Sequence, residues 1–326
     1  MKKLLLIPLL TAITLTTGAQ IPEKQSNRYG LLLVIKDGKA WVWGENKIRK
    51  IYKVNPDTIP GWTEPYTYVS ALEPEAFNSY DVESQVYKEY PDHTCRMDIY
   101  QPKNQGDGPF PYIMFIHGGG WKNGHEKYLR NFASYFASHG IASVCVSYTL
   151  AGQGDFKATN QDLLDAKIFI DKHAAQWKID PERFGFAGVS AGGHLSAFMA
   201  MTVPGTRVLI SQCGPHDLTK YVDDTGKLPS EIANYFGNTD KNLRQNSPIY
   251  RIPNNPPPAM LIHGTFDLIV APEQSRRFAK ALQEKGGKEV ELMLVPYAPH
   301  AAVNPKVAGY EQSLLRMLQF AHKHLD

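Results

Sequence analysis

The stretch G-F-A-G-V-S-A-G-G-H-L-S-A-F-M-A, from Gly185 to Ala200, decides the fold class. It begins as an apolar run typical of a buried strand and continues past Ser190 with the composition of a helix. A residue at such a sharp strand-to-helix turn has a strained backbone, and side chains beside it would collide with the strand and the helix. Gly188 and Gly192 avoid these collisions and leave the Ser190 hydroxyl exposed, as in the G-x-S-x-G nucleophile elbow. A glycine-rich turn with Ser190 as a helix cap is the simpler alternative.

Strands and helices alternate on both sides of this elbow. We expect strands at 96–102, 110–119, 141–148, 183–188, 207–214, 258–264 and 290–297, and helices at 127–138, 161–177, 273–285 and 310–324. Near-continuous apolar strands separated by helices predict an α/β fold with a mostly parallel twisted sheet covered on both faces. The early strands predict an antiparallel edge to that sheet.

Glycines also follow an earlier strand, in the sequence His117-Gly118-Gly119-Gly120-Trp121. Attack on an ester carbonyl produces an oxyanion, which needs N–H donors that no side chain blocks. Gly118, Gly119 and the N–H of Ala191 are the expected oxyanion hole. Trp121 and His117 are candidate pocket residues, and His117 is expected to pack rather than to act as a base. A phosphate-binding loop is the alternative, but the Gly-Lys-Ser/Thr ending of a P-loop is missing.

Among the eleven histidines, His300 is the expected base for Ser190, because it lies between the last expected strand and the last helix. His194 lies four residues beyond Ser190 and is expected to support the glycine loop. His322 and His324 fit a solvated helix end, where the helix dipole favours histidine.

The base needs a carboxylate to orient it. Asp267 follows a strand end and precedes His300, which gives the chain order Ser, Asp, His. Asp217 follows the preceding strand and is the second candidate. Asp162 and Asp165 fall inside an expected helix and are interpreted as solvated or capping residues.

Charge and cysteine content narrow the function classes. The formal net charge is +3, with no basic tract, which argues against a nucleic-acid partner and weakly favours a neutral or small substrate.

Three cysteines do not make a disulfide framework. Cys95, Cys145 and Cys213 are expected to be buried thiols, with one disulfide left open. No H-E-x-x-H motif, Cys/His spacing or carboxylate cluster is present, so we expect no metal and no cofactor.

The chain divides into three expected parts. Residues 1–19 have the layout of a secretory signal peptide, with Lys2 and Lys3, a short apolar run and a cleavage site after Ala19, which predicts a secreted or periplasmic protein. An N-terminal membrane anchor is the alternative, and no later stretch suggests a membrane span. Residues 20–81 are expected to be an extension that packs on the main domain, with a hairpin around Asp37-Gly38. Residues 82–326 form the expected catalytic domain, and 217–256 is a possible cap or lid.

These motifs together resemble the α/β-hydrolase esterase/lipase group, over roughly Val82 to Leu325. The sequences H-G-G-G-W, G-V-S-A-G-G-H, H-G-T-F-D-L-I-V and P-H-A-A-V stand in the order typical of that group. The resemblance is greatest to bacterial secreted esterases of the hormone-sensitive-lipase and feruloyl/acetyl esterase groups. Val189 and F-D-L-I-V replace the Asp before the Ser and the Asp-Pro-Leu that are usual in hormone-sensitive-lipase relatives.

The resemblance implies a serine carboxylesterase that works through an acyl-enzyme. Ser190 is then the nucleophile, His300 the base, Asp267 its partner, and the amides of Gly118, Gly119 and Ala191 the oxyanion hole. The expected partner is a small-molecule or polysaccharide-linked ester, such as an acetyl or feruloyl ester of a plant polysaccharide. Two other functions stay open: a serine peptidase of the prolyl-oligopeptidase type and an inactive hydrolase-fold binding protein. The sequence does not indicate the oligomeric state.

Overall fold

A computed structural model describes residues 31–36, 39–44, 47–53, 80–103, 106–221, 230–267, 269–295, 298–303 and 310–326. The expected signal peptide lies outside the described residues, and its assignment stays a prediction. The strands β1 (Leu31–Lys36), β2 (Lys39–Gly44) and β3 (Lys47–Lys53) form an antiparallel sheet of their own. Lys36 pairs with Lys39, so β1 and β2 form the expected hairpin.

The main sheet has eight strands in the order β11-β10-β9-β8-β6-β7-β5-β4. They are β4 (Tyr80–Glu89), β5 (Thr94–Pro102), β6 (Phe110–Ile116), β7 (Ala142–Val146), β8 (Ile179–Val189), β9 (Val208–Gln212), β10 (Ala259–Gly264) and β11 (Val290–Val295). The strands β6 to β11 are parallel, and β5 and β4 complete one side as an antiparallel edge. The expected α/β-hydrolase fold, with its antiparallel edge, is confirmed.

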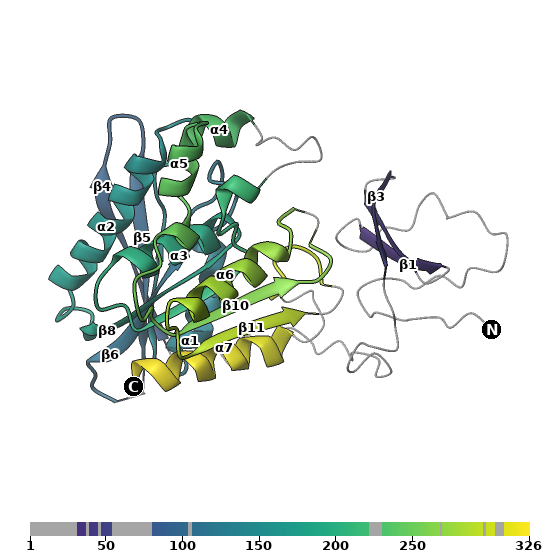
Figure 1. The fold of residues 1–326 in the computed structure, drawn as a ribbon. Coiled ribbons are helices and arrows are strands. Elements are labelled where there is room, and N and C mark those ends of the chain that lie inside the picture. Colours follow the sequence, from purple (N-terminus) through teal and green to yellow (C-terminus); the bar gives the residue numbers. More distant parts are fainter. Residues whose placement is uncertain are drawn as a thin grey trace.

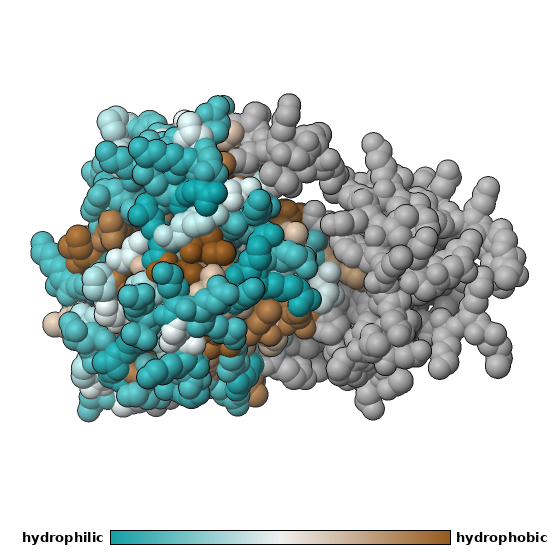
Figure 2. Space-filling model, viewed as in Figure 1, coloured by the Kyte–Doolittle hydropathy of each residue, from teal (hydrophilic) through white to brown (hydrophobic). Residues whose placement is uncertain are grey.

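Helices cover both faces of this sheet (Figure 1). They are α1 (Arg130–Ala137), α2 (Phe156–Lys172), α3 (Ala191–Thr202), α6 (Glu273–Glu284) and α7 (Tyr310–Leu325). Buried residues of α2, α3 and α6 share one core cluster with one face of the sheet, and those of α1 and α7 share another with the opposite face. Two cores explain why β6 and β10 are buried along their whole length. The outer surface over the helices is mostly hydrophilic (Figure 2).

The parallel register brings the carboxyl ends of neighbouring strands to one edge. Ile116 of β6 pairs with Gly188 of β8, and Val189 pairs with Gln212 of β9. On the other side, Gly264 of β10 pairs with Val295 of β11. The segments that follow these five strands therefore leave the sheet side by side, which is where open α/β sheets place their sites.

Two helices differ from the sequence-based prediction. Helix α2 begins at Phe156 rather than at 161, because the Asp155 side chain accepts a hydrogen bond from the Ala158 N–H and caps the helix. It ends at Lys172 rather than at 177. The expected helix at 127–138 consists of a short 3-10 turn, Glu126–Leu129, followed by α1.

The sequence suggested that Asp162 is a solvated or capping residue. In the structure its side chain is fully buried. Its carboxylate accepts hydrogen bonds from the Thr149 N–H at 2.8 Å and the Tyr90 hydroxyl at 2.6 Å, and it pairs with the Lys88 ammonium at 2.8 Å. The prediction was wrong because the inner face of α2 lies against the antiparallel edge, where these donors offset the cost of burying a charge. Asp165 is half-exposed and also pairs with Lys88.

The expected excursion at 217–256 lies between β9 and β10. Its described parts are η4 (Leu218–Lys220), α4 (Ser230–Phe236), α5 (Asp240–Gln245) and η5 (Pro248–Tyr250). Helix α5 is an addition to the expected single helical piece. The start of the excursion is held by α6. The buried side chain of Gln274 accepts from the Asp217 N–H at 2.8 Å and donates to the Asp217 carbonyl at 3.0 Å. Whether it acts as a lid stays a prediction.

Within the described residues, no helix combines the length and the apolar character needed to cross a membrane.

Candidate active site

The elbow has the strained geometry that its sequence predicts. Ser190 lies between β8 and α3 with φ 58° and ψ −121°, a conformation that L-residues rarely adopt. A Cβ atom on Gly192 would lie within 2 Å of the Ile116 carbonyl oxygen, and one on Gly188 would lie 2.2 Å from the Gly192 oxygen. Neither position can carry a side chain without moving the backbone. The Ser190 N–H donates to the Gln212 carbonyl at 2.8 Å, which holds the turn against β9.

The structure brings Ser190, His300 and Asp267 together. Nε2 of His300 lies 2.8 Å from Ser190 Oγ, and its Nδ1 lies 2.7 Å from Asp267 Oδ2. Because a carboxylate only accepts, Nδ1 carries a proton, and in the neutral ring Nε2 accepts from the serine hydroxyl. This relay is the arrangement that activates a serine nucleophile. Asp217 does not take part: its carboxylate accepts from the N–H and the hydroxyl of Thr219 and caps η4.

Asp267 is buried and held ionised by four donors. Its Oδ1 accepts from the N–H groups of Ile269 and Val270, both at 2.9 Å. Its Oδ2 receives His300 and also faces Nε2 of the buried His263, at 3.2 Å. Burial acts to raise the pKa of Asp267, but hydrogen bonds from His263 and His300 outweigh it and lower the pKa to about 2.

His263 is a supporting residue that the sequence analysis did not single out. Its Nε2 lies 2.9 Å from the Val270 carbonyl oxygen, so this nitrogen is a donor, and its Nδ1 lies 2.7 Å from the Ser275 hydroxyl. A proton on Nε2 can reach both the Val270 carbonyl oxygen and the Asp267 carboxylate. His263 therefore helps to fix the orientation of Asp267.

The segments that hold the acid and the base contact each other directly. The Phe266 N–H donates to the Ala298 carbonyl at 3.1 Å. Gly264 permits this approach, because a Cβ there would lie 2.2 Å from the same oxygen. Beyond His300, the buried side chain of Gln212 bonds both backbone groups of Val303. The backbone carbonyl of Gln212 thus holds the elbow, and the side-chain amide of Gln212 holds the segment that carries His300.

The charge state of His300 follows from its neighbours. Burial alone would lower its pKa, but Cys213 and Asp267 outweigh this and raise the pKa above its ordinary value. Its side chain is 18% exposed, whereas that of Asp267 is fully buried. His300 is the member of the pair that solvent reaches.

The glycine loop lies against the elbow. A Cβ on Gly118 would lie 2.7 Å from the Val189 carbonyl oxygen and 3.2 Å from Ser190 Cβ. Gly119 has φ +117° and turns the chain, so that the N–H groups of Lys122 and Asn123 both donate to its carbonyl. The amides of Gly118 and Gly119 donate to no backbone carbonyl within the described part of the chain. They are therefore available to an oxyanion beside Ser190.

Trp121 and His117 are both buried. Trp121 packs edge-on against His194 and Phe236, so it contacts the excursion. His117 stacks on Tyr148, whose hydroxyl donates to the His117 carbonyl, and burial lowers the pKa of His117 to about 4. A contact of either side chain with substrate stays a prediction.

His194 supports the excursion as well as touching the loop. Its Nε2 lies 2.7 Å from the Asn246 carbonyl oxygen, and it is therefore a donor. Burial lowers the pKa of His194 to about 4, so the ring is neutral. His194 therefore supports Trp121 of the glycine loop, as expected, and also the segment that follows α5.

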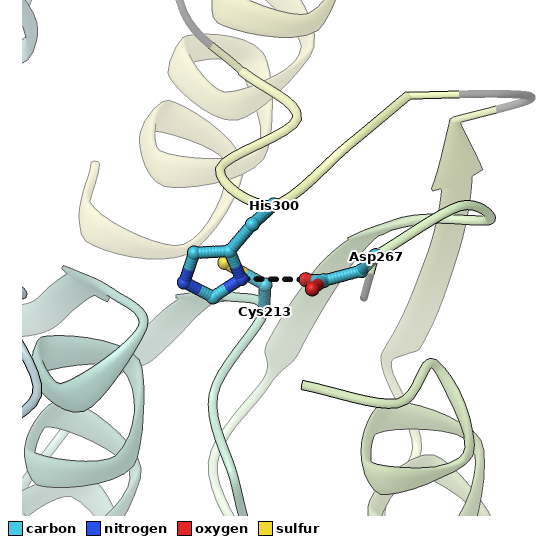
Figure 3. A group of neighbouring side chains, drawn as sticks. All are labelled: Cys213, Asp267 and His300. Carbon is cyan, nitrogen blue, oxygen red and sulfur yellow. Dashed lines mark hydrogen bonds and ion pairs between the residues drawn. The ribbon is translucent and has the colours of Figure 1, made fainter. Parts of the chain in front are cut away.

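The cysteines are free and buried, as expected. The thiol of Cys213 lies next to His300 and Asp267 (Figure 3). Cys145 belongs to the core under α1.

Residues 97–282, more than half of the chain, match the family BD-FAE. The chain belongs to the BD-FAE family. The matched range contains the elbow, the glycine loop and Asp267, and it ends before His300.

Several relatives of this BD-FAE chain are esterases by name. It is 27% identical over 248 residues to a probable isoprenylcysteine alpha-carbonyl methylesterase of Arabidopsis thaliana. The alignment covers 65% of this chain and 49% of the relative. The chain spans about half the length of the curated relatives it matches.

The solved structures that are similar to the BD-FAE chain include two esterases. A butyrate-bound thermophilic esterase of Thermogutta terrifontis is 25% identical, with a TM-score of 0.64 over 76% of this chain and 95% of its own. A truncated carbohydrate esterase from gut microbiota has a TM-score of 0.66 over 78% of this chain and 99% of its own, at 21% identity, which is evidence for the fold alone.

Proposed function

We propose that this protein is a serine carboxylesterase. The observation that carries the proposal is the unbroken relay from Ser190 Oγ to His300 Nε2 at 2.8 Å and from His300 Nδ1 to Asp267 Oδ2 at 2.7 Å. The strained elbow that presents Ser190 and the uncommitted amides of the glycine loop support it.

In the proposed reaction, Ser190 Oγ attacks the acyl carbon while His300 Nε2 takes the hydroxyl proton. The imidazolium that forms is stabilised by the buried Asp267 carboxylate. The oxyanion is held by the N–H groups of Gly118, Gly119 and Ala191, each donor contributing about 3 kcal/mol to the lowering of the barrier. His300 then protonates the leaving alcohol. A water molecule deprotonated by His300 releases the acid and restores the serine.

The proposed acyl group is short. Support comes from the esterase of Thermogutta terrifontis, whose structures hold butyrate and propionate. For the alcohol side, we propose a carbohydrate, with acetyl or feruloyl esters of plant polysaccharides as substrates. Two proteins that share this fold motivate the choice of substrate class: the carbohydrate esterase from gut microbiota and the bifunctional GH43-CE protein of Bacteroides eggerthii. Secretion or periplasmic location is also proposed, from the composition of residues 1–19.

The test compares wild type with Ser190→Ala on 4-nitrophenyl acetate, butyrate and octanoate, and on acetylated xylan and methyl ferulate. We expect hydrolysis of the short esters by wild type, none by Ser190→Ala, and covalent labelling of wild type by a fluorophosphonate. Cleavage of an aminoacyl-4-nitroanilide without ester hydrolysis would identify a peptidase instead. Absence of both labelling and turnover in folded protein would favour the binding protein.

A further inference from the structure

The thiol of Cys213 lies beside the acid and the base, although the relay does not use it. One ligand atom from each of Cys213, Asp267 and His300 lies within 4.8 Å of the other two (Figure 3). Cys213 directly follows β9 and is fully buried. Its φ of 45° is strained for a residue with a side chain, and its N–H donates to the Ile262 carbonyl at 2.8 Å. The surrounding structure therefore imposes this conformation and places the thiol beside the pair.

A thiolate, an imidazole and a carboxylate form the kind of ligand set that binds Zn²⁺ and other thiophilic cations. Zn–S and Zn–N bonds are about 2.3 and 2.0 Å long, so donors on one tetrahedral ion lie about 3–4 Å apart. Atoms that are already within 4.8 Å of one another reach that geometry through small movements. The thiolate and the carboxylate also neutralise a divalent cation, which removes the main cost of burying it.

We propose that Cys213, Asp267 and His300 form an inhibitory site for a thiophilic divalent cation such as Zn²⁺ or Cd²⁺. The proposal rests on the proposed function, because these groups include the acid and the base. The cation takes the lone pair of His300 Nδ1 and the carboxylate of Asp267, and the Cys213 thiol loses its proton to solvent. The proton on Nδ1 moves to Nε2, so the ring stays neutral. No group changes its oxidation state.

Inhibition follows from this change of tautomer. In the free enzyme Nε2 lies 2.8 Å from Ser190 Oγ and accepts its proton. With the cation on Nδ1, Nε2 carries a proton and cannot act as the base. The same cation also separates His300 from Asp267, which removes the carboxylate that stabilises the imidazolium.

The chain contains matched controls for this site. Cys145 is buried like Cys213 but lies in the core under α1. Among the residues that the structure describes, Cys213, Asp267 and His300 are the only such group of three. A response that belongs to this site must therefore depend on Cys213 and not on Cys145.

The experiment measures initial rates on 4-nitrophenyl acetate against free Cd²⁺ and Zn²⁺ for wild type, Cys213→Ser and Cys145→Ala, each compared with its own rate without metal. In parallel, Cd²⁺ is titrated into the protein and the thiolate-to-metal charge-transfer absorption is recorded. We expect EDTA-reversible inhibition of wild type and of Cys145→Ala. The inhibition constant for Cd²⁺ should rise at least tenfold in Cys213→Ser. The absorption should saturate at one Cd²⁺ per chain in wild type and in Ser190→Ala, and be lost in Cys213→Ser.

Equal inhibition of wild type and Cys213→Ser, or no absorption band in wild type, would overturn the proposal. If Cys213→Ser does not fold, Cys213→Ala takes its place, and the Cd²⁺ absorption must then be kept in Cys145→Ala and lost in Cys213→Ala. The spectroscopic titration does not need turnover, and fluorophosphonate labelling without metal tests the serine separately. Failure of the metal site and failure of the esterase are thus distinguished.

Discussion

The side-chain amide of Gln212 is hydrogen-bonded to both the N–H and the carbonyl of Val303, which lies 91 positions further along the chain. The backbone carbonyl of the same glutamine receives the Ser190 N–H at 2.8 Å. One residue therefore fixes the distance between the turn that carries the nucleophile and the segment that carries the base.

Gln212→Leu should lower kcat by about 10- to 100-fold with little change in KM, since misplacement of catalytic groups by about 1 Å can cost about 100-fold. The matched control is Gln274→Leu, because buried Gln274 makes the same double contact with Asp217, outside the relay. Both changes leave backbone groups unpaired and should cost about 1–3 kcal/mol of stability. Kinetics and thermal unfolding of the two variants separate the effects. Equal losses of kcat would contradict the role of Gln212.

Asp267→Asn should lower kcat by about 10⁴-fold, because the amide cannot hold His300 in the tautomer that accepts from serine. Asp217→Asn serves as the control, since that carboxylate only caps η4. Steady-state kinetics on 4-nitrophenyl butyrate provide the measurement. A larger loss in Asp217→Asn would move the acid to that residue.

The rate should rise with pH as His300 loses its proton, because only the neutral ring can act as a base. Its pKa is raised, so the midpoint of this limb of kcat/KM should lie above the ordinary value of 6.5. The same shift means that protonated His300 stabilises the fold fully below pH 6.5, and that this contribution is lost as the pH rises through the raised pKa. A pH profile with an uncharged ester measures the limb. A midpoint below 6.5 would show that burial outweighs the effects of Cys213 and Asp267 on the pKa of His300.

Gly192→Ala should destabilise the protein by about 1–3 kcal/mol and displace Ser190, because the new methyl group meets the Ile116 carbonyl oxygen. Thermal unfolding and the rate of fluorophosphonate labelling measure the two effects. Ala197→Gly, on the same helix but away from the turn, is the control: it should cost stability without slowing the labelling of the folded protein. Normal labelling of Gly192→Ala would mean that the turn does not need a glycine there.

The sheet, its helices and the three residues of the relay could be predicted because each has a local pattern. Near-continuous apolar runs that alternate with helices mark the strands. Ser190, Asp267 and His300 each follow a strand end in a recognisable motif. The start of α2 was missed because a single capping contact by Asp155 sets it, in a stretch with little apolar periodicity.

The supporting residues could not be predicted in this way. Gln212 and Val303 meet only because β9 and the segment after β11 come to the same edge of the sheet. His263 looks like an ordinary strand residue until its contact with Asp267 is known. Cys213 was correctly expected to be buried, but burial alone does not reveal which groups lie beside a thiol. Such roles depend on tertiary contacts that no spacing in the chain encodes.

The position of β11 at the edge of the main sheet determines how the protein loses activity on heating. Every residue of β11 is half-buried, whereas β6 and β10 are buried throughout, and β11 has a single neighbour in the main sheet. Edge segments of this kind open at a lower free energy than the centre of a sheet, and their amides exchange hydrogen first. His300 follows this strand, while Ser190 follows a central one. Warming should therefore detach the base while most of the sheet persists, so heat inactivation would begin as a local, reversible event rather than as global denaturation.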